Sequence, residues 1–173
     1  MNKVTVGILG GMGPRATLEF QSKLLAQFSG PDQSLPRIIC SNNGSIPDRS
    51  DFLVNNGPDP LDVLIEEARM LTRSKVDIVC MPCNTAHSPK ILSRLMAQVP
   101  LPIIDMPAAC ISEAEQKNFS TVLILGTTGS NRCKVFDTRT TKTNCIYPKT
   151  DDQVFIDTLI KTFKSGLQPS GVN

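Results

Sequence analysis

The stretch VDIVCMPCNTAHSPKILSRLMAQVPLPIID, residues 76–105, contains the alternation that decides the fold. It begins with the apolar run 76–81, which is typical of a strand buried on both faces of a sheet. Ser88-Pro89 then predicts the start of a helix, in which apolar residues recur at helical spacing over residues 91–99. The run 101–105 predicts a second strand. A strand, a helix and a strand in this order indicate a parallel α/β sheet.

The same alternation continues on both sides of this stretch. Apolar residues at helical spacing predict a helix over residues 61–71, entered through Asp59 and Pro60, and another over 155–163 that ends near Gly166. Short apolar runs rich in β-branched residues predict further strands at residues 4–9, 37–41, 121–126 and 144–147. We therefore expect an α/β protein. A boundary near Pro107 would divide it into residues 1–106, with four strands, and residues 107–173, with two.

Composition excludes several function classes. The chain has 173 residues, and its 18 Lys and Arg against 16 Asp and Glu give a net charge of +2. Binding to nucleic acid or to an anionic membrane through bulk charge is therefore disfavoured. No apolar run approaches the ~18 residues of a membrane span. Six cysteines without a secretion signal indicate reduced thiols and a cytoplasmic protein.

Glycine-rich or polar segments follow four of the predicted strands, where ligands bind in parallel α/β sheets. They are residues 10–14, 42–43, 82–85 and 127–130. The first contains Gly11, Met12 and Gly13 and fits the start of a dinucleotide-binding loop. Two features argue against that reading: the second strand does not end in an acidic residue, and Pro14 removes an amide donor. A smaller anion such as a carboxylate is the favoured ligand, and a plain tight turn is the other alternative.

Cys83 is the candidate reactive thiol. It directly follows a buried strand and precedes a helix, and helical amides favour a thiolate at such a position. The polar neighbours Asn84, Thr85 and His87 favour this interpretation over a buried structural cysteine. Cys80 and Cys83 also form a C-x-x-C pair, and His87 would add a third metal ligand. That reading is weak because no fourth ligand is well spaced and Cys80 lies inside the strand.

Two cations are candidates for binding a carboxylate. Arg49 lies in the long segment 42–59, which is predicted to lack secondary structure of its own, and such long loops are often functional. Its guanidinium either grips a carboxylate in the cleft or forms a solvated pair with Asp48 or Asp51. Lys164 lies in the last turn of the final helix, where a cation also complements the helix C-terminus.

Four of these segments occur together in an order and spacing that resembles the aspartate racemase branch of the cofactor-independent aspartate/glutamate racemase family. They are Gly10-Gly11-Met12-Gly13-Pro14-x-Ala16-Thr17, Asn42-Asn43-x-x-Ile46-Pro47-Asp48-Arg49, Met81-Pro82-Cys83-Asn84-Thr85-Ala86-His87 and Gly126-Thr127-Thr128-Gly129-Ser130. The resemblance covers nearly the whole chain. Lys164-Ser165-Gly166 also resembles the family's Lys-x-Gly.

The resemblance implies two α/β lobes with a cleft between them, a homodimer, and a small acidic amino acid as substrate. It implies no cofactor and no metal. Cys83 matches the family's first catalytic cysteine, which removes the Cα proton as a thiolate. Arg49 and Lys164 match positions that bind the side-chain carboxylate. The donors to the α-carboxylate match Asn84, Thr85 and Thr127, and Met12 of the glycine loop is counted with the substrate-binding residues.

One departure from the family bears on activity. The family's second cysteine lies in Gly-Cys-Thr-Glu after a later strand, and this motif does not occur in the sequence. We therefore expect an incomplete second lobe. The sequence predicts a racemase of aspartate or a related acidic amino acid, with activity impaired by the missing thiol. The alternative is a non-catalytic, carboxylate-binding remnant of a racemase, and a dinucleotide-dependent enzyme is a weaker third hypothesis.

Overall fold

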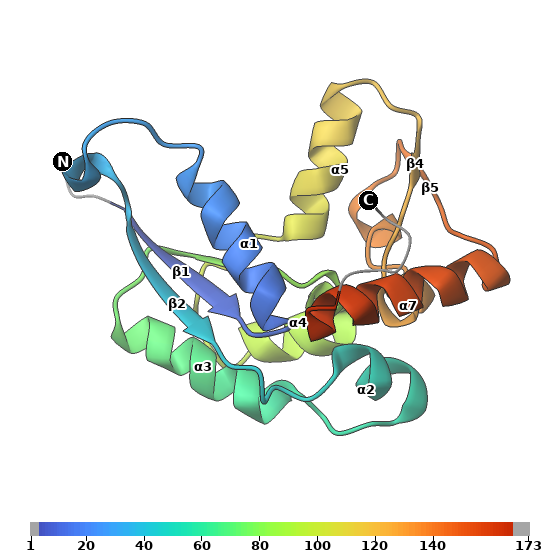
Figure 1. Ribbon diagram of the computed structural model, residues 1–173, viewed down its shortest axis with the longest axis horizontal. Helices are drawn as coiled ribbons and strands as arrows, with labels where there is room; N and C mark the ends of the chain where they lie inside the picture. The colour runs from blue at the N-terminus through green and yellow to red at the C-terminus, as the bar shows by residue number, and fades with distance from the viewer. Residues whose placement is uncertain (1–3, 168–173) are drawn as a thin grey trace.

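The computed structural model describes residues 4–167 and contains two parallel sheets with helices around them (Figure 1). Its strands are β1 (Thr5–Gly10), β2 (Arg37–Asn42), β3 (Ile78–Cys80), β4 (Thr121–Leu123) and β5 (Asn144–Ile146). Its α-helices are α1 (Pro14–Leu25), α2 (Arg49–Asn55), α3 (Leu61–Arg73), α4 (Pro89–Met96), α5 (Met106–Gln116), α6 (Thr128–Arg132) and α7 (Thr150–Ser165). Three short 3₁₀ helices are η1 (Asp32–Ser34), η2 (Asn84–His87) and η3 (Asp137–Arg139).

The first sheet has the order β2-β1-β3, and both neighbours of β1 are parallel to it. The prediction of a full fourth strand over residues 101–105 is wrong. Only a single bridge forms there, between Val79 and Ile103, with Val79 N–H donating to the Pro102 carbonyl at 2.9 Å. Pro102 has no N–H of its own, so this segment cannot complete a regular ladder.

The larger core lies between the first sheet and the helices α3 and α4. Leu64, Ala68 and Leu71 of α3 are fully buried, as the helical spacing predicted. Ile91 and Leu95 of α4 are buried against the same cluster. This packing fixes the carboxyl end of β3, and therefore the start of the segment that carries Cys83.

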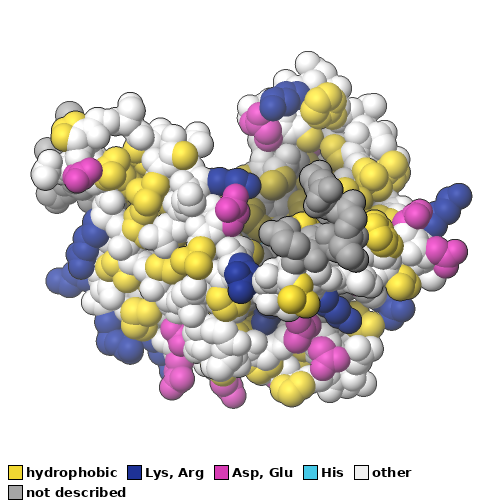
Figure 2. All heavy atoms as spheres, viewed as in Figure 1, with side chains coloured by type: hydrophobic (Ala, Val, Ile, Leu, Met, Phe, Trp, Pro, Cys, Tyr) yellow, Lys and Arg dark blue, Asp and Glu magenta, His cyan; other side chains and the backbone are white. Residues whose placement is uncertain are grey.

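The second sheet pairs β4 with β5, also in parallel. One of its faces packs on a small core formed by Ile111, Ile124, Val135 and Phe136. The opposite face is open, because Leu123 and its partner on β5, Ile146, are 54% and 44% exposed. Figure 2 shows hydrophobic side chains at the surface over α5 and the neighbouring strands.

Several boundaries differ from the predictions. The segment 42–59 is not without structure, because Asp48 accepts a hydrogen bond from Asp51 N–H and starts α2. The expected boundary between residues 106 and 107 falls in the first turn of α5. The last helix, α7, ends at Gly166 as predicted, with a left-handed φ of 79°. Within residues 4–167, no helix is long and apolar enough to span a bilayer.

Candidate active site

The glycine loop after β1 depends on a close approach of two chain segments. Gly11 has a φ of +89°, and a Cβ there would lie 2.1 Å from the Asn43 carbonyl oxygen. Its N–H donates to the Thr17 hydroxyl at 2.9 Å. Pro14 begins α1, so that helix starts with one amide fewer. The loop is therefore a tight turn that brings β1 and the segment after β2 into contact.

Met12 and Arg49 are joined by a hydrogen bond within this region. The Arg49 Nη2 donates to the Met12 carbonyl at 2.7 Å, and Nη1 donates to the carbonyls of Ile46 and Pro47 at 3.0 and 2.8 Å. Met12 is 3% exposed and packs in the larger core. Arg49 is 5% exposed, so the predicted solvated pair with an aspartate is wrong. Its buried Nε–H makes no hydrogen bond among the described residues.

Cys83 lies at the carboxyl end of β3, as the sequence predicted. It is half-buried beside the larger core, and its extended backbone starts the 3₁₀ turn η2. Its carbonyl accepts a hydrogen bond from Nδ1 of His87 at 2.9 Å. His87 is fully buried, and burial lowers the pKa of its imidazole below the ordinary value. Within residues 4–167, no three His, Cys, Asp or Glu side chains form a metal-binding group.

Three hydroxyls connect the Cys83 turn to the second half of the chain. The Thr85 and Thr127 hydroxyl oxygens are 2.9 Å apart, and the Ser50 hydroxyl donates to Thr127 at 2.9 Å. The contact is possible because Gly129 has no side chain: a Cβ there would lie 2.7 Å from the Ser50 Cα. The turn after β3, helix α2 and the start of α6 therefore meet at one point.

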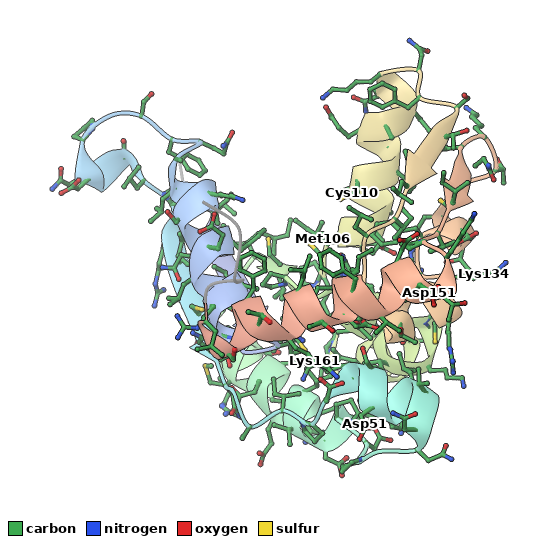
Figure 3. All side chains as sticks on the ribbon, turned by 45° about the vertical axis from the view of Figure 1, so that its right-hand side comes forward. Asp51, Met106, Cys110, Lys134, Asp151 and Lys161 are labelled. Atoms are coloured by element: carbon green, nitrogen blue, oxygen red, sulfur yellow. The ribbon has the colours of Figure 1, made fainter. Side chains whose placement is uncertain are left out.

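A pocket of about 320 Å³ opens beside these hydroxyls, between α2, α6 and α7. Ser50 and Thr127 line it, together with Lys161 and Lys164 of α7. Figure 3 labels Lys161 on α7 and Asp51 on α2, the two helices that face each other across it. The pocket can therefore offer hydroxyl and ammonium donors to an anion.

Asp48 also lines this pocket. Partial burial would raise the pKa of its carboxyl. The Asp51 N–H bond and the charges of Arg49 and Lys164 outweigh that effect and lower the pKa. Asp48 is therefore an anion at neutral pH, and Asp51 and Asp157 also line the pocket opposite its two lysines.

The structure brings some of the predicted site residues together and leaves others apart. Thr127 and Lys164 line the pocket, and Thr85 reaches its wall through the hydroxyl contact. Cys83 and Asn84 lie on the turn behind that wall and are not among the lining residues. Lys164 also lies over the glycine loop, with its Cγ 3.5 Å from the position a Cβ on Gly13 would take.

Comparison with known proteins identifies the family of this arrangement. The model of the Asp/Glu/Hydantoin racemase family matches residues 9–145, well over half of the chain. The chain belongs to this racemase family. Its matched region includes the glycine loop, the Cys83 turn and the start of α6.

Solved structures agree with this assignment. A Picrophilus torridus aspartate racemase is 25% identical, with a TM-score of 0.79 over 94% of this chain and 75% of that one. An aspartate racemase homologue from Pyrococcus horikoshii OT3 is 19% identical, with a TM-score of 0.71 over 96% of this chain and 74% of its own. A Campylobacter jejuni glutamate racemase is 16% identical, with a TM-score of 0.55, and the match covers 97% of this chain and 63% of that one. The fold is thus the α/β fold of the racemases.

Three residues with contacts at this pocket and at the Cys83 turn were not predicted from the sequence. Ser50 was not among the predicted site residues, although its hydroxyl donates to Thr127. Asp157 of α7 accepts hydrogen bonds from the N–H and the hydroxyl of Thr128, at 3.0 and 2.5 Å. Arg139 reaches the Cys83 turn from the second half of the chain. Each of them contacts a segment that is distant along the chain, and no short sequence pattern predicts such a contact.

Proposed function

We propose that the chain acts on aspartate or a related acidic amino acid, with Cys83 removing the Cα proton as a thiolate and no cofactor taking part. The observation that carries the proposal is the junction of Thr85 with Thr127. It joins the turn after β3, on which Cys83 lies, to the wall of the pocket that holds Lys164. A substrate in this pocket would contact Thr127 and Lys164, and the proposal requires that it also reach Cys83 past Thr85.

The polar groups around the junction suit a substrate with two carboxylates. Thr85, Thr127 and the Asn84 backbone would donate to the α-carboxylate. Lys164, which is exposed on α7, would bind the side-chain carboxylate. Arg49, predicted to bind this carboxylate directly, does not line the pocket, and it would instead act from behind by holding the glycine loop. The Met12 carbonyl would act through Arg49, which it holds in place.

The chemistry depends on stabilising charge that develops on the substrate. The α-proton of an amino acid is very weakly acidic, so a thiolate removes it only where donors stabilise the carboxylate as negative charge accumulates there. Inversion also needs an acid on the opposite face of Cα, within ~3 Å or through one water. Cys133 and Cys145 pack on the small core, and Cys110 is exposed on α5 (Figure 3). Cys83 alone supports proton exchange on one face.

Cα proton exchange in D₂O tests this proposal. L-aspartate, D-aspartate and L-asparagine are incubated with the chain, and loss of the Cα proton is followed by NMR. We expect exchange of one aspartate enantiomer that exceeds its inversion, and little exchange of asparagine. Cys83→Ala should abolish the exchange, while Cys80→Ser, within β3, should retain it. Exchange that survives Cys83→Ala would contradict the assignment of the base.

The same experiment addresses the alternative of a non-catalytic remnant. Such a protein binds aspartate without exchange at Cα, and calorimetric titration measures this binding directly. Lys164→Met should weaken it by roughly tenfold, because one cation in a partly open pocket contributes about 1–2 kcal/mol. Binding without exchange in the wild-type chain would favour the remnant over the enzyme.

A further inference from the structure

Arg139, the last residue of η3, connects the second half of the chain to the Cys83 turn. Its side chain is only 10% exposed. Nη2 donates to the His87 carbonyl at 2.7 Å, and Nε donates to the Asp105 carboxylate at 3.0 Å. The guanidinium, which comes from residues 107–173, therefore binds two points of residues 1–106.

Local contacts hold the Arg139 guanidinium in this orientation. Nη1 donates to the Val135 carbonyl and to the Thr138 hydroxyl, both at 2.6 Å. Asp105, its partner, accepts from Ala108 N–H at 3.1 Å and so caps α5. Since both ends of the contact are already fixed by their own elements, forming it costs little side-chain freedom.

His87 continues the connection to Cys83. A carbonyl oxygen only accepts, so the contact of Nδ1 with the Cys83 carbonyl requires the proton on Nδ1. In the neutral ring, Nε2 is then an acceptor for Met106 N–H at 3.4 Å, and the Ile104 carbonyl, 3.3 Å from Nε2, receives no proton from the ring. Met106 begins α5, at the end of the helix nearest the first half (Figure 3). His87 thus links the backbone of Cys83 to Met106, the first residue of α5.

We propose that Arg139 and His87 are positioning residues that hold the backbone of Cys83 at a fixed place relative to the second half of the site. The proposal rests on the proposed role of Cys83 as the base. Neither side chain lines the pocket between α2, α6 and α7, so neither is assigned a contact with substrate. Displacing a reacting group by about 1 Å costs up to roughly 100-fold in rate. Loss of the connection should therefore lower kcat and leave KM nearly unchanged.

A matched pair of variants at His87 tests the role of its Nδ1 proton. The side-chain amide of Asn can place an N–H near the Nδ1 position, whereas that of Gln reaches the Nε2 position. We expect His87→Asn to retain kcat for Cα exchange within a few-fold and His87→Gln to lower it roughly 10- to 100-fold. The rate of Cys83 alkylation by iodoacetamide, read by peptide mass spectrometry, should change in the same order.

Arg139 is tested in parallel. Arg139→Gln should lower kcat and alter Cys83 alkylation, and Arg139→Lys should rescue part of both because it keeps the charge without the fork. Arg73→Gln, on the exposed end of α3, is the control and should change neither. If Arg139→Gln fails to fold, the His87 pair and Arg139→Lys decide the question.

The outcomes separate this inference from the proposed function. Exchange that persists in Cys83→Ala overturns the role of Cys83 itself. If Cys83→Ala abolishes exchange while the His87 and Arg139 variants keep wild-type kcat and Cys83 alkylation rates, the positioning role is wrong and the base stands. Equal losses in His87→Asn and His87→Gln would also overturn it, because they would show that the Nδ1 proton does not matter. Alkylation reports on Cys83 even where exchange is undetectable.

Discussion

Replacing Arg49 with Met should destabilise the protein strongly, although arginine is usually a surface residue. Two of the carbonyls it binds, those of Met12 and Ile46, are buried at the contact. A buried acceptor left without its donor costs about 1–3 kcal/mol, so these two cost about 2–6 kcal/mol. The Pro47 carbonyl is only partly buried, and water can replace its donor. Relief of the buried, unbonded Nε–H offsets about 1–2 kcal/mol. With the middle of each range, about 4 less about 1.5, we expect a net loss of about 2.5 kcal/mol.

Urea unfolding followed by circular dichroism measures this loss. With an m value of about 2 kcal/mol/M, the midpoint should fall by about 1.2 M. Arg94→Met is the control, because Arg94 pairs with Asp59 at 2.8 Å on the surface, with side chains 46% and 41% exposed. Such pairs contribute about 0.2–1 kcal/mol, so this midpoint should shift by less than about 0.5 M.

The difference between the urea midpoints of Arg49→Met and Arg94→Met tests whether the buried carbonyls depend on Arg49. A midpoint for Arg49→Met that falls no further than that of Arg94→Met would show that the buried carbonyls find other donors. The account of the loop between β2 and α2 would then be wrong. Arg49→Lys should lie between the wild type and Arg49→Met, because a compact ammonium cannot reach three carbonyls at once.

Three further outcomes are expected. Burial lowers the pKa of His87, so the unfolded chain takes up this proton first as pH falls through about 6.5. Stability should therefore fall by up to about 1.4 kcal/mol per pH unit below that point, and urea midpoints of His87→Gln should lack this component. Gly11→Ala should lower the free energy of unfolding by more than about 2 kcal/mol, because Gly11 has a positive φ and an added Cβ would overlap Asn43. Gly44→Ala is the control in the same assay. Its added Cβ would meet only a proline Cγ at 3.3 Å, so the loss should be less than about 1 kcal/mol. Leu123→Thr on the open face of β4 should reduce binding of a hydrophobic dye and change stability by less than about 0.5 kcal/mol; an unchanged dye signal would show that this face is covered.

The elements set by local patterns could be predicted from the sequence. The spacing of Leu64, Ala68 and Leu71 identified α3 because each of them is buried on one face of the helix. The position of Cys83 after β3 followed from the rule for parallel sheets. The prediction of a full strand around Pro102 was wrong, because it gave more weight to the apolar residues than to the missing N–H of the proline.

The contacts of the site could not be predicted in the same way. Arg49 was expected either in the cleft or in solvent, yet its partners are backbone carbonyls, which carry no sequence signal. Arg139 lies 52 residues from His87 along the chain, so only the folded arrangement joins them. Ser50 and Thr127 likewise meet because Gly129 permits close approach of two helices.

Arg49 and Arg139 serve the same physical need at two loops of the first sheet, those after β1 and β3. Loops at the carboxyl ends of strands leave the sheet ladder, so their carbonyls lack partners there, and a buried carbonyl without a donor is costly. A regular element would supply those donors, but it would also occupy the amides and hydroxyls that an anion requires. Arginine offers five N–H donors and no acceptor, and so satisfies carbonyls while leaving the donors of the loop free. The irregular backbone at Met12 and at His87 is therefore compatible with burial because an arginine from another element binds it.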